Sequence, residues 1–288
     1  MKVVPVGVMN KNLQSSNDLN CSAMLDSKSL NDGKLANEVH LMAAVPGSGS
    51  AWSMGSVKAI TGLGTIATEK VTLPRKRHAF YYKTHYPYFG SKNPSLVEHP
   101  DKTAVLIRNP FDAGISEFTR RNLKRELAKR KRTERGNYTQ EKGKYKGIID
   151  IQEILYLVPD KEIPSEGFES WIQSYMLRWK TFHRYWLKDY KGSVKTVFYQ
   201  DLMKNISKFV DVVEYFGFNT TLTTERRQRL ECFIDAHETI NTRRRPQSDV
   251  IDHAKEVLKE YYAKDVQETI SYVETLLANK YNKKFVIL

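Results

Sequence analysis

The stretch EVHLMAAVPGSGSAWSMGSVKAIT, from Glu38 to Thr61, decides the fold that the rest of the chain has to follow. A short apolar run from Glu38 to Val45 leads into Pro46-Gly47-Ser48-Gly49-Ser50 and then into a helix-compatible segment from Trp52 to Thr61. A strand, a glycine-rich turn and a helix in this order form an anion site, because backbone N–H groups converge on the ligand and the helix dipole adds partial positive charge. The segment from Pro46 to Trp52 is therefore predicted to hold a phosphate-like group.

This turn differs from the loop of common nucleoside triphosphatases. That loop has the pattern GxxxxGK[ST], and neither its lysine nor its metal-binding hydroxyl stands in the required register here. ATP hydrolysis is disfavoured on this ground. Taken alone, the Gly-Ser turn is also compatible with an ordinary connection between a strand and a helix.

Further strands are predicted at Ala79 to Lys83, Ala104 to Ile107 and Val194 to Tyr199, each followed by a helical pattern. Strands that alternate with helices indicate an α/β fold, in which a parallel sheet is covered by helices on both faces.

Helical patterns are clearest in four later segments. The first carries large aromatic and apolar side chains at Phe168, Trp171, Ile172, Tyr175, Trp179, Phe182 and Trp186, and the second carries Leu202, Ile206, Phe209, Val210 and Val213. The third and fourth lie nearer the C-terminus, at Leu222 to Ile234 and at His253 to Leu277. Spacing of this kind is typical of faces that pack into the core, and we interpret the tryptophan stripe as core rather than as a binding site.

The chain of 288 residues allows one large domain or two small ones. Residues 1–36 predict a loosely ordered extension, because they are polar and lack periodicity. Residues 37–288 are predicted to form one domain, with a basic, flexible insertion around residues 120–166. The two cysteines, Cys21 and Cys232, allow at most one disulfide and have no spacing typical of a zinc site.

The charge of the chain favours polyanionic partners. Its 46 basic and 33 acidic residues leave a net charge of +13, and the segment from Arg120 to Lys146 holds twelve basic residues against three acidic ones. A solvated, charged helix and loop is one interpretation of this segment, and an electrostatic funnel toward an anionic ligand is the other. Apolar runs long enough to span a membrane are absent from the sequence.

Two more segments carry residues suited to chemistry on an anion. Tyr82-Lys83-Thr84-His85 ends a predicted strand, and the alternation of an extended chain places Lys83 and His85 on one side. Arg108 follows the next predicted strand, Asn109 can cap a helix, and Pro110 can open it. An arginine at this place can make a forked contact with a second phosphate.

Together these segments resemble the sulfotransferases that use 3′-phosphoadenosine 5′-phosphosulfate (PAPS). That family combines a loop of the type PxSGxxW, a KTH segment and a motif RNPxDxxxS in this order, and Pro46 to Trp52, Lys83 to His85 and Arg108 to Ser116 are similar to them. The segment from Phe198 to Leu202 is similar to a later family segment. The resemblance runs from about Val45 to Arg245, and it looks closest to the branch of sulfotransferase-like proteins associated with WSC domains.

The resemblance implies a P-loop-type three-layer sandwich and a role for each matching residue. The 5′-phosphosulfate would be held by Gly47, Ser48, Gly49, Ser50, Ala51 and Trp52; the 3′-phosphate by Arg108, Ser116 and the run Arg243, Arg244 and Arg245; and the adenine by Trp52 and Tyr199. His85 looks like the general base for an acceptor hydroxyl, and Lys83 like the group that stabilises charge on the sulfuryl group. The implied product is adenosine 3′,5′-bisphosphate (PAP), and no metal is required.

One position departs from many members of the family, which have a lysine where Gly47 stands. The loss of that lysine lowers the expected activity, but Lys83 remains and the WSC-associated branch also has glycine at this position. We therefore expect an active enzyme.

Other functions stay open at this stage: a nucleotide kinase-like protein, a basic nucleic-acid-binding protein, and a catalytically silent protein that binds PAPS. The expected partner is a hydroxyl-bearing acceptor, either a glycan or a small molecule, and no specific nucleic acid is expected. We expect a cytoplasmic protein, or one of the Golgi lumen if the chain lacks an anchor that its relatives carry.

Overall fold

A parallel sheet forms the centre of the computed structural model, which describes residues 38–63, 65–67, 81–87, 100–121, 166–221, 223–241, 255–256 and 258–287. Its strands are β1 (His40–Ala44), β2 (Thr65–Ala67), β3 (Tyr81–Thr84), β4 (Lys102–Ile107) and β5 (Val194–Phe198). They lie in the order β2-β3-β1-β4-β5, and every neighbouring pair is parallel. The parallel sheet predicted from the alternation of strands and helices is confirmed.

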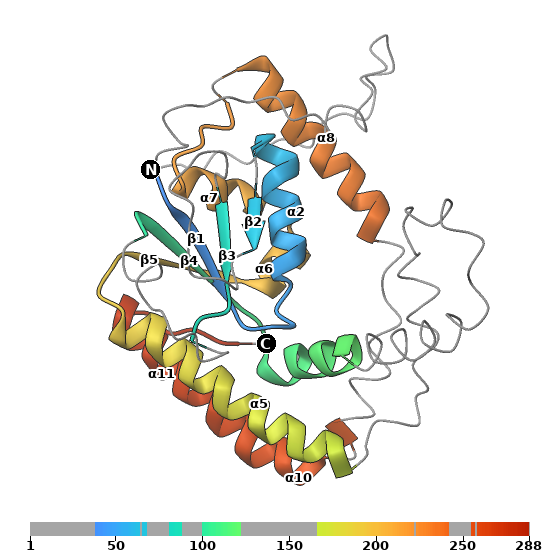
Figure 1. Ribbon diagram of the computed structural model, residues 1–288, viewed down its shortest axis with the longest axis vertical. Helices are drawn as coiled ribbons and strands as arrows, with labels where there is room; N and C mark the ends of the chain where they lie inside the picture. The colour runs from blue at the N-terminus through green and yellow to red at the C-terminus, as the bar shows by residue number, and fades with distance from the viewer. Residues whose placement is uncertain are drawn as a thin grey trace, which may run out of the picture.

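Helices cover both faces of the sheet, which gives the predicted three-layer α/β sandwich (Figure 1). One face is covered by α2 (Ser50–Thr61), α6 (Tyr199–Lys204), α7 (Lys208–Tyr215) and α8 (Thr224–Asn241). The other is covered by α5 (Glu166–Arg184), the π-helical turn η4 (Tyr185–Asp189), α10 (Lys259–Tyr261), the π-helical turn η5 (Tyr262–Val266) and α11 (Gln267–Tyr281).

The alternation of β1 shows why two helical layers are needed. Leu41 and Ala43 are buried in the cluster that contains α5 and α11, whereas Met42 and Ala44 are buried in the cluster that contains α2 and α7. Because successive side chains of a strand point to opposite faces, a fully apolar strand is stable only between two apolar layers. β4 follows the same pattern, with Val105 and Ile107 on the α5 face.

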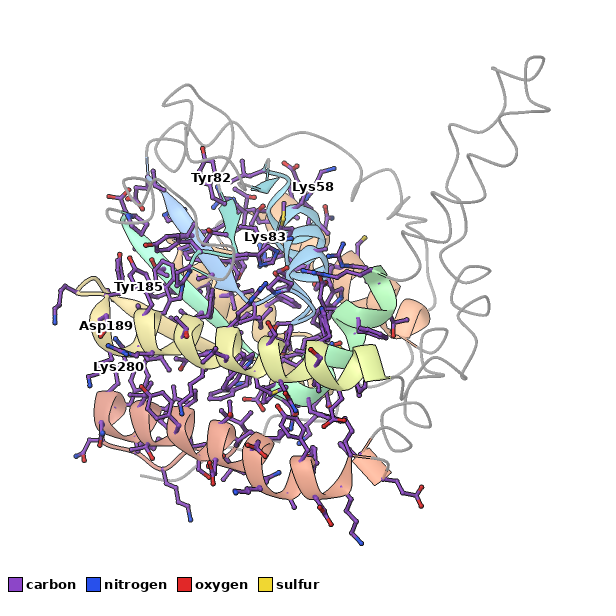
Figure 2. All side chains as sticks on the ribbon, turned by 60° about the horizontal axis from the view of Figure 1, so that its bottom comes forward. Lys58, Tyr82, Lys83, Tyr185, Asp189 and Lys280 are labelled. Atoms are coloured by element: carbon purple, nitrogen blue, oxygen red, sulfur yellow. The ribbon has the colours of Figure 1, made fainter. Side chains whose placement is uncertain are left out.

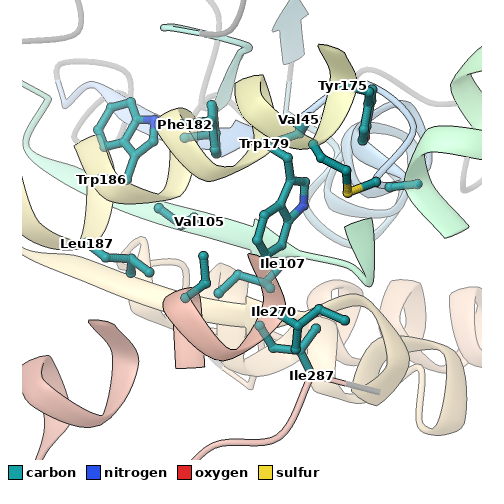
Figure 3. Close-up of a cluster of buried hydrophobic side chains, with 14 of the residues drawn as sticks. Val45, Val105, Ile107, Tyr175, Trp179, Phe182, Trp186, Leu187, Ile270 and Ile287 are labelled. Atoms are coloured by element: carbon teal, nitrogen blue, oxygen red, sulfur yellow. The ribbon is translucent and has the colours of Figure 1, made fainter. Parts of the chain in front are cut away.

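The aromatic stripe of α5 forms core, as predicted. Phe168, Ile172, Trp179 and Trp186 are fully buried, and the row faces Val45, Val105 and Ile107 of the sheet (Figure 3). Helical periodicity therefore identified this packing face correctly.

Three elements of the structure differ from the prediction. β2 was not predicted, because a strand of three residues is too short to show a period. The segment from Leu202 to Val213 forms two helices, since the chain leaves helical geometry at Asn205, where φ is −144° and ψ is 101°. The C-terminal helix is divided by η5 into α10 and α11. The predicted extension at residues 1–36 and nearly all of the predicted insertion, residues 122–165, lie outside the described residues.

Two observations concern covalent and membrane features. Cys232 on α8 is disulfide-bonded, and its partner lies outside the described residues. Within the part of the chain that the structure describes, no helix combines the length and apolar composition needed to cross a bilayer.

One histidine lies within the core of this fold. His183 on α5 is fully buried, its Nδ1–H donates to the carbonyl oxygen of Trp179 at 2.9 Å, and its Nε2 has no partner. Burial lowers the pKa of His183 to about 3, and the hydrogen bond to Trp179 offsets only part of this effect. The imidazole is therefore neutral in the folded protein across the physiological range.

We predict that His183 makes the protein less stable in acid. Between pH 6.5 and about 3, the unfolded chain binds a proton at this residue that the folded chain does not bind, so unfolding becomes easier as the pH falls. The contribution approaches about 1.4 kcal/mol per pH unit below the unfolded pKa. Denaturant unfolding of wild type and His183→Gln from pH 7 to pH 4 should show a shallower loss of stability in the variant. Parallel curves for the two proteins would contradict the prediction.

Candidate active site

The predicted site residues meet at one edge of the sheet. The turn before α2 follows β1, His85 follows β3, Arg108 follows β4, and Tyr199 follows β5. These four strands are neighbours in the order β3-β1-β4-β5, so their carboxyl ends lie side by side (Figure 1). In open parallel sheets, ligands bind in the crevice outside these ends.

The turn before α2 has a backbone that only glycine adopts easily. Gly47 has a φ of 88° and Gly49 a φ of 86°, both in the left-handed region. A Cβ on Gly47 would overlap the carbonyl oxygen of Ala113, and one on Gly49 would lie 2.6 Å from a ring carbon of Tyr199. The two glycines thus allow the loop to press against the segments that follow β4 and β5.

The loop leads into the N-terminus of α2, which has no capping side chain. Gly49 occupies the cap position, makes no side-chain hydrogen bond to the helix, and the first turn carries no acidic residue. The first N–H groups of a helix have no intrahelical partner and carry partial positive charge. This end of α2 is therefore suited to an anion.

Two buried side-chain atoms at the loop have no hydrogen-bond partner. The Oγ of Ser48 and the Nε of Arg108 form no hydrogen bond, although Ser48 is fully buried and Arg108 is only 9% exposed. Burying a polar atom without a partner costs about 1–3 kcal/mol. Such atoms beside an uncapped helix end fit a ligand with several acceptor oxygens.

Arg108 also supports the loop itself. Its Nη1–H donates to the carbonyl oxygen of Gly47 at 2.8 Å, and its guanidinium lies 4.5 Å from the ring centre of Tyr199. The arginine therefore connects the ends of β1, β4 and β5. Sequence analysis assigned it to a phosphate but did not predict this contact with the loop.

The helix over residues 110–121 begins as the sequence predicted. Asn109 Oδ1 accepts hydrogen bonds from the N–H groups of Phe111 at 2.9 Å and Asp112 at 3.4 Å, and Pro110 is the first helical residue. Ser116 lies two turns further along, on the same helix, and is partly buried.

His85 is held by the neighbouring strand. Its Nδ1 lies 2.5 Å from the carbonyl oxygen of Ala44, at the end of β1. A carbonyl oxygen only accepts, so Nδ1 is the protonated nitrogen of the neutral ring and Nε2 carries the lone pair. The imidazole, 9% exposed, thus has the tautomer that a base acting through Nε2 needs.

Lys83 lies two residues before His85, on β3. It pairs with Met42 of β1, which belongs to the α2 face, so Lys83 also projects on that side. Figure 2 shows its label beside β3 on the side of α2. Lys83 therefore lies on the side of the sheet that α2 covers.

Aromatic rings lie beside the loop, at the start of α2 and just after β5. Trp52 of α2 meets Tyr199 edge-on at 5.7 Å between ring centres and Phe209 at 4.9 Å. Trp52 and Tyr199 are both partly exposed. The structure thus brings together the two residues predicted to contact the adenine.

A buried carboxylate lies behind the loop, and sequence analysis gave it no role in the site. Glu117 is fully buried and accepts hydrogen bonds from Arg120 Nε at 2.7 Å and Arg121 Nε at 2.8 Å. Burial raises the pKa of Glu117, but the hydrogen bonds and charges of the two arginines outweigh it and leave the pKa below the ordinary value. Glu117 is therefore ionised and neutralised in place, with its Cβ next to the position that a Cβ on Gly47 would take.

Some predicted site residues are not tested. Arg243, Arg244 and Arg245 lie outside the described residues. Among the residues that are described, no three His, Cys, Asp or Glu side chains cluster as a metal site.

Comparisons with known proteins give one structural neighbour to report. No family model matches the chain, and no curated protein matches it. The crystal structure of mouse sulfotransferase SULT7A1 complexed with PAP is similar over 91% of this chain and 92% of the other, with 14% identity and a TM-score of 0.42.

We predict that Gly47→Ala destabilises the protein and impairs the loop. The new Cβ would overlap the Ala113 carbonyl at a positive φ, which costs about 1–3 kcal/mol for the backbone alone. Gly55→Ala is the matched control, because Gly55 lies in the middle of α2 with open space around it and alanine should stabilise the helix by about 0.5–1 kcal/mol. Denaturant unfolding measures both changes, and equal stability of the two variants would contradict the prediction.

Proposed function

We propose that this chain is a PAPS-dependent sulfotransferase that moves a sulfuryl group to a hydroxyl of a glycan or a small molecule. One observation carries the proposal. Segments that resemble the family's loop, KTH and RNPxDxxxS motifs follow adjacent parallel strands and meet at one sheet edge. Their order in space, with the base on one side of the loop and the arginine on the other, fits a donor anion between them.

The residues present fit such a donor. The unpartnered Ser48 Oγ, the unpartnered Arg108 Nε and the uncapped end of α2 supply donors for anionic oxygens. On this proposal Gly47 to Trp52 bind the 5′-phosphosulfate, Arg108 and Ser116 bind the 3′-phosphate, and Trp52 and Tyr199 contact the adenine. Arg243 to Arg245 remain predicted contacts of the 3′-phosphate.

His85 and Lys83 carry the chemistry in this proposal. His85 Nε2 accepts the proton of the acceptor hydroxyl while the acceptor oxygen bonds to sulfur, and the bond from sulfur to the bridging oxygen breaks with its electron pair leaving on PAP. Lys83 offsets the negative charge on the transferring group. The other residues of the site position the donor and the acceptor, because an in-line transfer requires donor and acceptor oxygens on opposite sides of the sulfur.

The gap left by the family's lysine has a structural explanation. The positive φ of Gly47 and the nearby Ala113 carbonyl disfavour any side chain at position 47. We infer that the charge is supplied instead by α2, Arg108 and Lys83, which also favours activity over a silent PAPS-binding protein. The WSC-associated branch and the class of acceptor stay predictions.

The rival functions have less support from the geometry. A kinase-like protein would need the lysine of the Walker loop, which the sequence lacks. A nucleic-acid-binding protein would depend on the basic segment from Arg120 to Lys146, of which only Arg120 and Arg121 are described. Both of these arginines are bonded to Glu117.

The disulfide of Cys232 favours the Golgi lumen over the cytoplasm as the location. Disulfides persist in oxidising compartments and are rare in the cytosol. Alkylation followed by intact mass measurement should find no free thiol before reduction and two modified cysteines after it, since the chain has two cysteines. Thiols that are alkylated without reductant in protein from the secretory pathway would support the cytoplasmic alternative.

The main experiment separates donor binding from catalysis. PAP at about 100 times its dissociation constant should stabilise wild type by about 2.7 kcal/mol in a thermal-shift titration, whereas ADP, AMP and ATP should stabilise it less. His85→Ala should keep the PAP response and lose turnover with PAPS by about 10² to 10⁴-fold, because a positioned base contributes that much.

The outcomes point to different conclusions. An equal response to all nucleotides removes the assignment of the 3′-phosphate site and favours the kinase-like or nucleic-acid-binding alternative. Unchanged turnover in His85→Ala removes the general base but leaves the donor site intact. Moderate salt in all titrations suppresses nonspecific attraction to the basic surface.

A further inference from the structure

Helix α5 and the π-helical turn η4 that continues it touch both halves of the candidate active site through polar atoms. Tyr175 of α5 and Trp186 of η4 are buried on the side that faces the sheet, with 1% and 0% exposure. They are eleven positions apart, which is close to three helical turns, so they lie on one face about 16 Å apart along the axis. Figure 3 shows them at opposite ends of the same row of side chains.

Tyr175 reaches the turn from Pro46 to Gly49 before α2, which we call the anion loop. Its hydroxyl donates to the carbonyl oxygen of Pro46 at 2.6 Å. Pro46 immediately precedes Gly47, so this bond holds the start of the loop from the side of α5. The bond is buried, and it joins residues 129 positions apart in the chain.

Trp186 reaches the segment that carries the base. Its indole Nε1–H donates to the carbonyl oxygen of Tyr86 at 2.9 Å, and Tyr86 directly follows His85. Tyr185 supports the same residue, because its ring meets that of Tyr86 edge-on at 5.2 Å. His85 is thus held by Ala44 of β1 on one side and, through its neighbour, by α5 on the other.

The π-helical turn η4 begins where these contacts are made. Tyr190 N–H donates to the carbonyl oxygen of Tyr185 at 2.7 Å, a bond between residues five apart. Figure 2 places Tyr185 at this end of α5. A π turn widens the helix and changes the direction of its side chains, and such turns occur often at functional sites.

A third aromatic residue of the row provides a contrast. Trp179 of α5 is as deeply buried as Trp186 of η4, but its indole Nε1 has no partner. An indole in this row can therefore be buried without making a hydrogen bond of the kind that Trp186 makes. The tryptophan at 179 serves packing, while the one at 186 also fixes a carbonyl of the active site.

We propose that α5 is a strut that sets the position of the anion loop relative to His85, with Tyr175 and Trp186 as its positioning residues. This inference rests on the proposed function for its kinetic consequence. Group transfer needs the donor and the base in register, and a displacement of about 1 Å can cost about 10²-fold in rate. Loss of one buried hydrogen bond corresponds to about a tenfold effect.

The test compares Trp186→Phe with Trp179→Phe, since both remove an indole from the same buried row. Trp186→Phe should lower kcat about tenfold or more relative to Trp179→Phe, while PAP affinity stays within about twofold in both. Tyr175→Phe should show the opposite pattern, with PAP affinity reduced about tenfold and kcat at saturating PAPS changed less. Denaturant unfolding of each variant separates these effects from a general loss of stability.

A second measurement does not depend on activity. Nitrogen-15 NMR of the His85 ring, assigned with His85→Ala, should report protonated Nδ1 in wild type and Trp179→Phe and a mixture of tautomers in Trp186→Phe. Equal kcat and equal His85 spectra in the two tryptophan variants would overturn the proposed positioning role of Trp186. If wild type neither binds PAP nor transfers sulfuryl groups, the proposed function fails, and the NMR comparison still decides whether Trp186 positions His85.

Discussion

The close contact between the anion loop and the helix that follows β4 constrains the rest of the site. Gly47 lies against the Ala113 carbonyl in a left-handed conformation, and Arg108 donates to the Gly47 carbonyl from the end of β4. The loop can therefore hold its shape only where β1 and β4 are neighbours and end level with each other. The parallel register of these strands, with Ala44 opposite Leu106, meets that condition.

Positive groups lie at the candidate site, and a neutralised carboxylate lies behind the loop. The uncapped end of α2 and Arg108 supply partial or full positive charge at the loop, and Lys83 lies on the side of the sheet that α2 covers. Behind it, Glu117 is a buried carboxylate that would oppose an anion, but Arg120 and Arg121 neutralise it by direct hydrogen bonds. The two arginines in turn are held at fixed places near the site. This arrangement holds Arg120 and Arg121 beside each other, because a central carboxylate offsets the repulsion between adjacent guanidinium groups.

Much of the site was predictable because its signals are local. The glycine turn, the cap at Asn109 with Pro110 after it, and the placement of His85 and Arg108 after strands all depend on neighbours in sequence. The contacts of Tyr175 with Pro46 and Trp186 with Tyr86 were missed, because a tyrosine or tryptophan at helical spacing gives the same pattern whether its polar atom is bonded or not. Trp179 and Trp186 share one periodicity and differ only in a partner about a hundred residues away.

The sequence by itself determined the α/β class, the glycine turn after the first strand and the core face of α5, and it predicted the residues of the candidate site, because periodicity, capping and turn formation are properties of short segments. Only the tertiary structure decided the strand order β2-β3-β1-β4-β5, which places His85 on one side of the loop and Arg108 on the other. It also decided that a side chain is disfavoured at position 47 and that Glu117 lies ionised behind the loop. These features depend on which segments pack together, and packing joins residues that no local pattern connects.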